Sequence, residues 1–145
     1  MRYVLDTNTL SFAMAGEASV CRRLLSQQRT DVLLPQPVVA EIAYGLARLR
    51  KSKKRERLLK RFRMFLDETR RAAWTDAVSQ AFGAAKAELE RRGIRIEDFD
   101  VAIAAHALAL DATLISDNID HMRHVPGLRV DNWRPRPADS STPTI

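Results

Sequence analysis

Four acidic residues border the apolar segments of this sequence, and their side chains could hold a metal ion. Asp6 follows "YVL", Asp117 follows "ATLIS", Glu41 lies within "VVAEIAYGL", and Asp100 precedes "VAIAAHALAL". Carboxylate oxygens are the ligands that the hard cations Mg²⁺ and Mn²⁺ prefer. Such ions activate water and stabilise the attacking and leaving oxygens of a phosphodiester. The residue types therefore indicate metal-dependent hydrolysis.

Each of these carboxylates also has a purely structural explanation. Asp6 could equally cap the next helix, and Asp117 alone reads as a turn residue. Glu41 and Asp100 adjoin apolar stripes, where an unpaired carboxylate is costly and requires a partner. No Lys or Arg is placed locally to neutralise the four, because the basic run lies elsewhere in the sequence. A shared cation would satisfy all of them.

Short apolar segments alternate with helical patterns along the chain, which predicts a parallel sheet covered by helices on both faces. We expect a three-layer α/β/α domain with a mostly parallel central sheet. The expected strands are 2–5, 31–35, 72–74, 112–116 and 128–133. The expected helices are 11–28, 37–49, a basic helix within 48–71, 76–93, a helix within 94–111, and a short one within 117–127.

In an open parallel sheet, ligands bind outside the carboxyl ends of the strands. Asp6 and Asp117 come directly after expected strands, while Glu41 and Asp100 lie in the first turns of expected helices. All four carboxylates are therefore expected at the same rim of the sheet.

Length and composition indicate one ordinary globular domain of 145 residues. No apolar run approaches the roughly 20 residues that a membrane span needs, and the first residues lack the pattern of a signal peptide. The single cysteine, Cys21, can form no internal disulfide and is expected in the core. A cytoplasmic location is the expectation.

The net charge of +6 is unevenly distributed. Segment 48–71 holds half of the 24 basic residues but only 3 of the 18 acidic ones. Such a patch attracts polyanions, above all nucleic acid, and Lys51, Lys53 and Lys54 are its candidate RNA contacts. The alternative is a solvated helix face opposite the stripe from Leu58 to Leu66.

The segments "VLDTN", "VVAEIAYGL", "FDVAIAAHALAL", "ATLISDN" and "VPGLRVDNW" together resemble a PIN domain, specifically the VapC toxins of type II toxin–antitoxin systems. The match runs from residue 1 to about 133, and 134–145 is expected to be a disordered tail. The resemblance implies a metal-dependent endoribonuclease held inactive by a cognate antitoxin. By position, Asp6, Glu41 and Asp100 match the three acids of the family, with Asp6 and Asp100 as the primary metal ligands.

The fourth acidic position is open in this sequence, because Ser116, Asp117 and Asn118 replace the usual Thr followed by Asn or Asp residues. Asp117 is the expected fourth acid, although either Asp117 or Asn118 could face the metal. Hydrogen bonds from Thr7, Asn8, Ser116 and Asn118 are expected to support the ligands. Asp98 is a rival to Asp100 that points about 200° away on a helix, and it is expected to be an N-cap.

Two other classes of protein compete with this interpretation. Haloacid-dehalogenase-type phosphatases need a second Asp two residues after the first, where this chain has Asn8. A non-catalytic nucleic-acid-binding or regulatory module remains open as the alternative.

The expected partners are an RNA substrate, a VapB-like antitoxin and a second copy of the chain, with no membrane. His106 reads as a core residue, and His121 and His124 receive no role.

Overall fold

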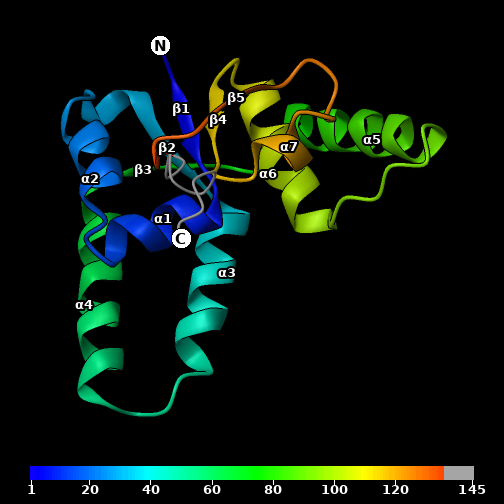
Figure 1. The fold of residues 1–145 in the computed structure, drawn as a ribbon. Coiled ribbons are helices and arrows are strands. Elements are labelled where there is room, and N and C mark those ends of the chain that lie inside the picture. The colour runs from blue at the N-terminus through cyan, green and yellow to red at the C-terminus, as the bar shows by residue number, and fades with distance from the viewer. Residues whose placement is uncertain (136–145) are drawn as a thin grey trace, which may run out of the picture.

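Five short strands form a single sheet in the computed structural model of the protein, which describes residues 1–135 (Figure 1). The strands are β1 (Tyr3–Leu5), β2 (Val32–Pro35), β3 (Arg70–Ala72), β4 (Thr113–Ile115) and β5 (Arg129–Asp131). All four neighbouring pairs are parallel. The predicted tail lies outside the described residues from 136 onward, so its disorder and the domain limit at 133 stay predictions.

Helices cover the sheet and complete an α/β/α arrangement, which confirms the predicted fold class. They are α1 (Thr7–Met14), α2 (Ala18–Leu25), α3 (Gln36–Ala47), α4 (Lys53–Glu68), α5 (Asp76–Arg91), α6 (Asp98–Ala109) and α7 (Ile119–Met122), with a 3₁₀ turn at Arg29–Asp31. In Figure 1, α2 and α4 lie to one side of the strands, and α5 and α6 lie to the other.

The strand order β3-β2-β1-β4-β5 puts the first strand at the centre of the sheet. The chain builds outward from β1 in one direction through β2 and β3, and then in the other through β4 and β5. Leu5 is paired with Ile115, so β1 and β4 end side by side. The order of the strands reverses between them, and a crevice is expected at such a switch point.

The predicted helix 11–28 is wrong in this form, because the structure has two helices there. Gly16 adopts a φ of 81°, a left-handed conformation that ends a helix and that residues with a side chain disfavour. Glu17 then caps α2, with its carboxylate accepting hydrogen bonds from the backbone N–H groups of Ser19 and Val20. The chain turns between α1 and α2 as a result.

Several other predicted boundaries shift by a few residues. α1 begins at Thr7 and not at residue 11, β3 covers Arg70–Ala72 and not 72–74, and α3 begins at Gln36. Among residues 1–135, no helix is both long enough and apolar enough to span a membrane.

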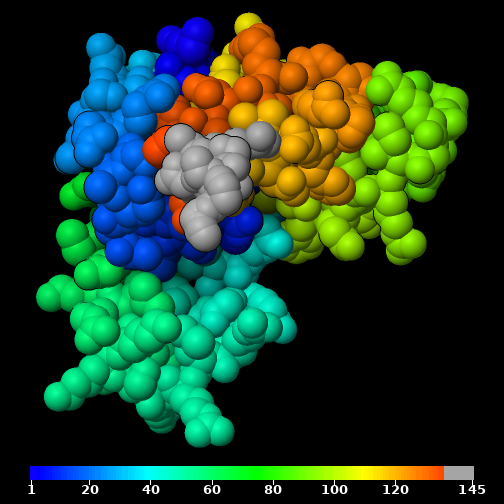
Figure 2. Space-filling view, in the orientation of Figure 1, coloured from blue at the N-terminus to red at the C-terminus, as the bar shows by residue number. Residues whose placement is uncertain are grey.

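Helices α3 and α4 form an arm that extends away from the sheet (Figures 1 and 2). Where the arm leaves the domain, the guanidinium of Arg61 donates a hydrogen bond to the carbonyl of Met14 at 2.8 Å. Closer to its tip, the Nε of Arg55 donates to the carbonyl of Leu46 at 3.2 Å, which ties α4 to α3. The connection 48–52 closes the tip of the arm.

The described core predicts that substitutions of two leucines will differ in their effect on the free energy of unfolding. Leu114 of β4 is fully buried, whereas Leu25 at the end of α2 is 87% exposed. Leu114→Ala should lower the free energy of unfolding by about 2–5 kcal/mol because it leaves a cavity in the core. Leu25→Ala should change it by less than about 0.5 kcal/mol. Urea unfolding of both variants checks this, and equal losses would contradict the described core.

Candidate functional site

Asp6 lies at the switch point of the sheet, one residue after β1. Its Oδ1 accepts a hydrogen bond from the backbone N–H of Thr9 at 2.8 Å, so the side chain caps α1. Burial raises the pKa of Asp6, the charge of Asp117 raises it further, and hydrogen bonds from Ser116 and Thr9 oppose the shift. The sequence left helix capping and metal ligation as alternatives for Asp6. In the structure, the Asp6 carboxylate caps α1 and also lies within the influence of the Asp117 charge.

Asp117 approaches Asp6 from the neighbouring strand β4. Its Oδ1 is buried and has no hydrogen-bond partner in the described part of the chain. The preceding Ser116 is fully buried and accepts a hydrogen bond from the backbone N–H of Asn118 at 3.0 Å. The turn after β4 therefore directs Asp117 toward Asp6, while Asn118 serves as the N-cap residue of α7.

Glu41 and Asp100 bring two further carboxylates to this rim, from α3 and α6. The Thr7 hydroxyl donates a short hydrogen bond to Glu41, so the start of α1 orients a side chain from another helix. Burial raises the pKa of Asp100, and the charges of Glu41 and then of Asp6 raise it further. The four acids predicted to share one rim are thus linked by their electrostatic effects on one another.

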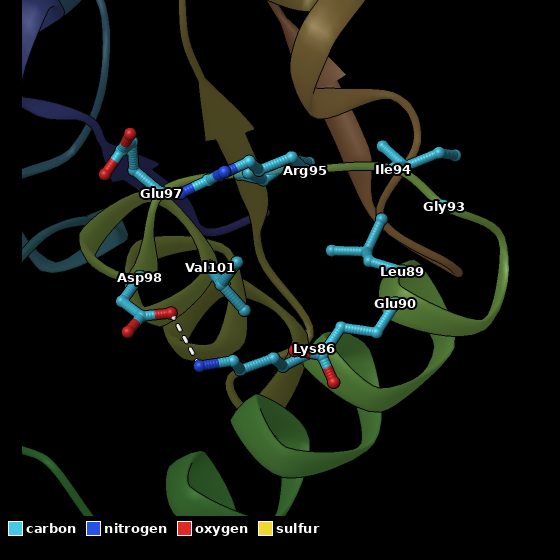
Figure 3. Close-up of a pocket in the computed structure, with 10 residues that line it drawn as sticks. Lys86, Leu89, Glu90, Gly93, Ile94, Arg95, Glu97, Asp98 and Val101 are labelled. Carbon is cyan, nitrogen blue, oxygen red and sulfur yellow. Dashed lines mark ion pairs between the residues drawn. The ribbon is translucent and has the colours of Figure 1, made fainter.

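Asp98 has a different role from the predicted one. It is the first residue of α6 and not its N-cap, because Glu97 occupies the cap position. Its carboxylate forms an ion pair with Lys86 of α5 at 3.0 Å (Figure 3). The prediction of an N-cap was wrong by one residue, because α6 begins at Asp98. The Asp98 side chain instead makes a tertiary contact with α5 that no local pattern shows.

Three side chains near the acids were not predicted to act there. Thr9 supports Asp6 through its backbone, and its hydroxyl donates to the carbonyl of Ile115 at 3.0 Å. Glu97 raises the pKa of Asp100 by its charge, and His121 lowers it. The capping position of Thr9, three residues after Asp6, was a signal in the sequence. Glu97 and His121 carried none.

Of the remaining predicted residues, four are exposed and one is buried. Asn8 is exposed in the first turn of α1. Lys51 stands in the connection at the tip of the arm, and Lys53 and Lys54 open α4 beside it, all three exposed. His106 is fully buried, as predicted, and its Nδ1 lies 2.7 Å from the carbonyl of Ala102.

The donor set at the rim fits a hard divalent cation. None of the four carboxylates pairs with a Lys or Arg among the described residues, and one buried oxygen of Asp117 has no partner at all. As the side chains lie, no three Asp, Glu, His or Cys residues within 1–135 converge closely enough to enclose an ion. Like charges repel one another, so a cation would have to draw the carboxylates together.

The structure is a parallel α/β fold with carboxylates gathered at the switch point of its sheet. Sequence comparison shows the family to which the chain belongs. The family model of the PIN domain matches residues 3–128, and the chain therefore belongs to the PIN-domain family. It is 32% identical over 136 residues to ribonuclease VapC2 of Rickettsia felis, covering 92% of this chain and 98% of that protein. The resemblance to VapC proteins predicted from the motifs is confirmed.

A further relative and a solved structure agree with this placement. The chain is 24% identical to the tRNA(fMet)-specific endonuclease VapC of Salmonella typhimurium, over 92% of this chain and 98% of the relative. The crystal structure of VapBC2 from Rickettsia felis, bound to a DNA fragment from its promoter, superposes with a TM-score of 0.80 at 32% identity. That superposition covers 92% of this chain and 99% of the relative's chain.

The raised pKa values predict how stability depends on pH. Because the pKa of Asp100 is above its ordinary value of 3.8, the folded state favours the protonated carboxyl. The stability that protonated Asp100 contributes to the folded state is fully present below pH 3.8. It is lost as the pH rises through the raised pKa of Asp100. In chelator at pH 7, Asp100→Asn should raise the thermal midpoint by about 2–4 °C for each kcal/mol of relieved repulsion. The difference should shrink toward pH 4.

Glu17 provides a control of opposite sign. Hydrogen bonds from Val20 and Ser19 lower its pKa, so its contribution to stability is present above the unfolded pKa and is lost as the pH falls. Glu17→Gln should therefore lower the midpoint at pH 7. A midpoint that falls for Asp100→Asn under the same conditions would contradict the described clustering of like charges.

Proposed function

We propose that this protein is the toxin of a type II toxin–antitoxin pair and cleaves RNA by metal-dependent hydrolysis of phosphodiester bonds. The observation that carries the proposal is the set of four carboxylates at the switch point of a PIN-domain fold, none of them paired with Lys or Arg in residues 1–135. Relatives named as ribonucleases support the reaction class. RNA is abundant in the cytoplasm, so we place the reaction there.

Asp6 and Asp100 would be the primary ligands of Mg²⁺ or Mn²⁺, with Glu41 and Asp117 completing the acidic shell. When bound, such an ion activates water for attack on phosphorus and stabilises the charge on the leaving oxygen. The raised pKa values of Asp6 and Asp100 mean that each carboxylate gains more from a cation than an ordinary surface acid would. The buried oxygen of Asp117 would gain its missing partner.

The surrounding residues of the chain hold these carboxylates in place. Thr9 and Ser116 fix the Asp6 side chain, and Thr7 fixes Glu41. Because Asp6 is both a helix cap and an acid of the site, its orientation is set before any substrate arrives. No side chain of the chain is required as a covalent nucleophile.

The proposed partners are an RNA substrate, a cognate VapB-like antitoxin and a second copy of the chain. One relative is named for the tRNA that it cleaves, which makes tRNA a reasonable first substrate to test. The antitoxin could block the site with an arginine, because a guanidinium binds carboxylates through two parallel hydrogen bonds and stays charged. Such an arginine would displace the metal and exclude RNA together.

Metal dependence is the first test of this proposal. Purified protein should cleave total cellular RNA with added Mg²⁺ or Mn²⁺ and not in chelator. Asp6→Asn and Asp100→Asn should each lower the cleavage rate by at least about 100-fold, since even the outer partners of metal ligands are worth 10–100-fold. Cleavage is measured by the release of fragments on gels.

Asp98→Asn is the matched control, because it also removes one carboxylate at the start of α6 but breaks only the ion pair with Lys86. It should retain activity within a few-fold. If Asp98→Asn abolishes cleavage and Asp100→Asn does not, the third acid is misassigned. A wild-type protein that binds RNA without cleaving it under any metal condition would favour the non-catalytic alternative.

The tip of the arm is predicted to supply RNA affinity and not chemistry. Changing Lys51, Lys53 and Lys54 together to Gln should flatten the slope of log affinity against log salt by up to about 2, at roughly 0.7 per lost phosphate contact. KM should rise while kcat stays constant. The measurement is RNA binding across a salt series, together with steady-state kinetics.

A variant with the same change in net charge controls for the overall field of the protein. Arg91, Arg92 and Arg129 each pair with a carboxylate elsewhere on the surface, and their joint change to Gln should leave the slope nearly unaltered. If both triple variants flatten the slope equally, the lysines act only through net charge and the arm is a solvated surface.

A further inference from the structure

The rim that carries the acids continues into a hollow with aromatic walls. This hollow, of about 480 Å³, is lined by Glu41, Glu97 and Asp100 and also by Tyr44 and Phe99. Acidic and aromatic side chains therefore share one depression. A substrate bound at the carboxylates would meet the two aromatic rings within the same space.

A second hollow of about 320 Å³ extends this depression along α6. It is lined by Trp74, Phe82 and Pro37, and Ala40, Asp98 and Phe99 line both hollows. Because they share these three residues, the two hollows adjoin, and we call them together the groove. We call Tyr44, Trp74 and Phe99 the aromatic wall.

The aromatic wall is unusually exposed for its residue types. Tyr44 is 66% exposed, and Trp74 and Phe99 are each 47% exposed. Burying such rings is favourable, so their exposure costs stability in the isolated chain. Large apolar side chains left exposed beside a polar site commonly mark a surface for a ligand.

Trp74 is also held rigidly, as a preformed platform would be. Its indole N–H donates to the Ser79 hydroxyl at 2.7 Å. Its ring meets His106 edge-on at 5.4 Å and Phe82 at 6.1 Å between centroids. A ring fixed on its inner side and open on its outer side loses little conformational freedom when a ligand stacks on it.

Cations accompany the aromatic rings along the groove. The guanidinium of Arg48 lies over the Tyr44 ring at 5.6 Å, and the Lys86 ammonium lies 5.9 Å from the Phe82 ring. Beyond Lys86, a third hollow of about 540 Å³ adds Arg95 (Figure 3). Lys86 is already paired with Asp98, whereas Arg48 pairs with no carboxylate within residues 1–135. Flat rings for bases with a nearby cation for phosphate are parts of a surface for single-stranded nucleic acid.

We propose that the aromatic wall is a subsite that stacks unpaired bases of the RNA beside the scissile phosphate. This deepens the proposed ribonuclease function and rests on it. Specific recognition of RNA favours unpaired bases that can splay out and stack on aromatic side chains. The groove would thus select single-stranded loops or ends and exclude the paired stem, whose bases are already stacked.

A second copy of this chain is the competing occupant, because exposed apolar patches also mark protein interfaces. RNA is favoured on two grounds: the wall begins inside the hollow of the carboxylates, and Arg48, which pairs with no carboxylate within residues 1–135, lies against the Tyr44 ring.

The test measures stacking separately from cleavage. Because the chain has only two tryptophans and Trp133 is buried, a Trp133→Phe, Asp6→Asn double variant reports on Trp74 alone without cutting RNA. The probes are a 12-nucleotide oligoadenylate and the same ribose-phosphate chain made abasic. Oligoadenylate should quench the Trp74 fluorescence and bind about 5- to 150-fold more tightly than the abasic chain.

Phe99→Ala in this background should remove most of the advantage of oligoadenylate, and the conservative Phe99→Tyr should keep it. Leu25→Ala, which removes an exposed side chain on α2 that lines neither hollow of the groove, should leave both affinities unchanged. Thermal midpoints establish that each variant is folded. Loss of the advantage in Phe99→Ala but not in Phe99→Tyr supports stacking on this wall.

The proposal is overturned if the abasic chain binds as tightly as oligoadenylate, or if Phe99→Ala leaves the difference intact. It is also overturned if sedimentation shows that Phe99→Ala converts a dimer to a monomer with no change in base dependence, since the wall would then be an interface between copies. The binding test requires no cleavage. If the protein stacks bases but cleaves no RNA, the proposed nuclease activity is refuted and the stacking subsite is not.

Discussion

The site depends on one constraint, the parallel pairing of β1 with β4. With Leu5 opposite Ile115, both strands end at the same level, and Asp6 and Asp117 leave them as neighbours. A protein interior ordinarily avoids two like charges so placed. Here Ser116 and Thr9 hold the pair together through hydrogen bonds to Asp6 and Ile115. The acidic site exists because the geometry of the sheet outweighs electrostatic repulsion.

The acids could be predicted from the sequence because each follows a local apolar pattern and a general rule of sheet geometry brings strand ends together. What failed depended on contacts across the fold. The ion pair of Lys86 with Asp98 and the effect of His121 on Asp100 join residues that no local pattern connects. The break at Gly16 was missed for another reason, since apolar periodicity continues on both sides of it. That the charge of Asp117 acts on Asp6 depends on the direction of the turn after β4.

The distribution of charge follows from the same site. A cation placed beside the four carboxylates would pair with them and occupy the place of a metal. The basic residues of 48–71 instead stand mostly on the arm and its tip, where they attract a polyanion without neutralising the acids. Fields between exposed charges fade over a Debye length of about 8 Å at physiological salt. A fold with a strongly acidic site and a strongly basic surface therefore benefits from carrying its basic residues on the projecting helices α3 and α4.

The central position of β1 also governs when the acidic rim can form during synthesis. The strand made first is completed by a neighbour made near the end, as shown by the bond from Thr9 to Ile115 across a separation of 106 residues. Pairings so distant in sequence form late and slowly, and a chain on the ribosome grows by about 5–20 residues per second. A nascent chain therefore has Asp6 and Glu41 without Asp100 or Asp117. Several seconds of synthesis therefore separate the first carboxylate of the rim from the last.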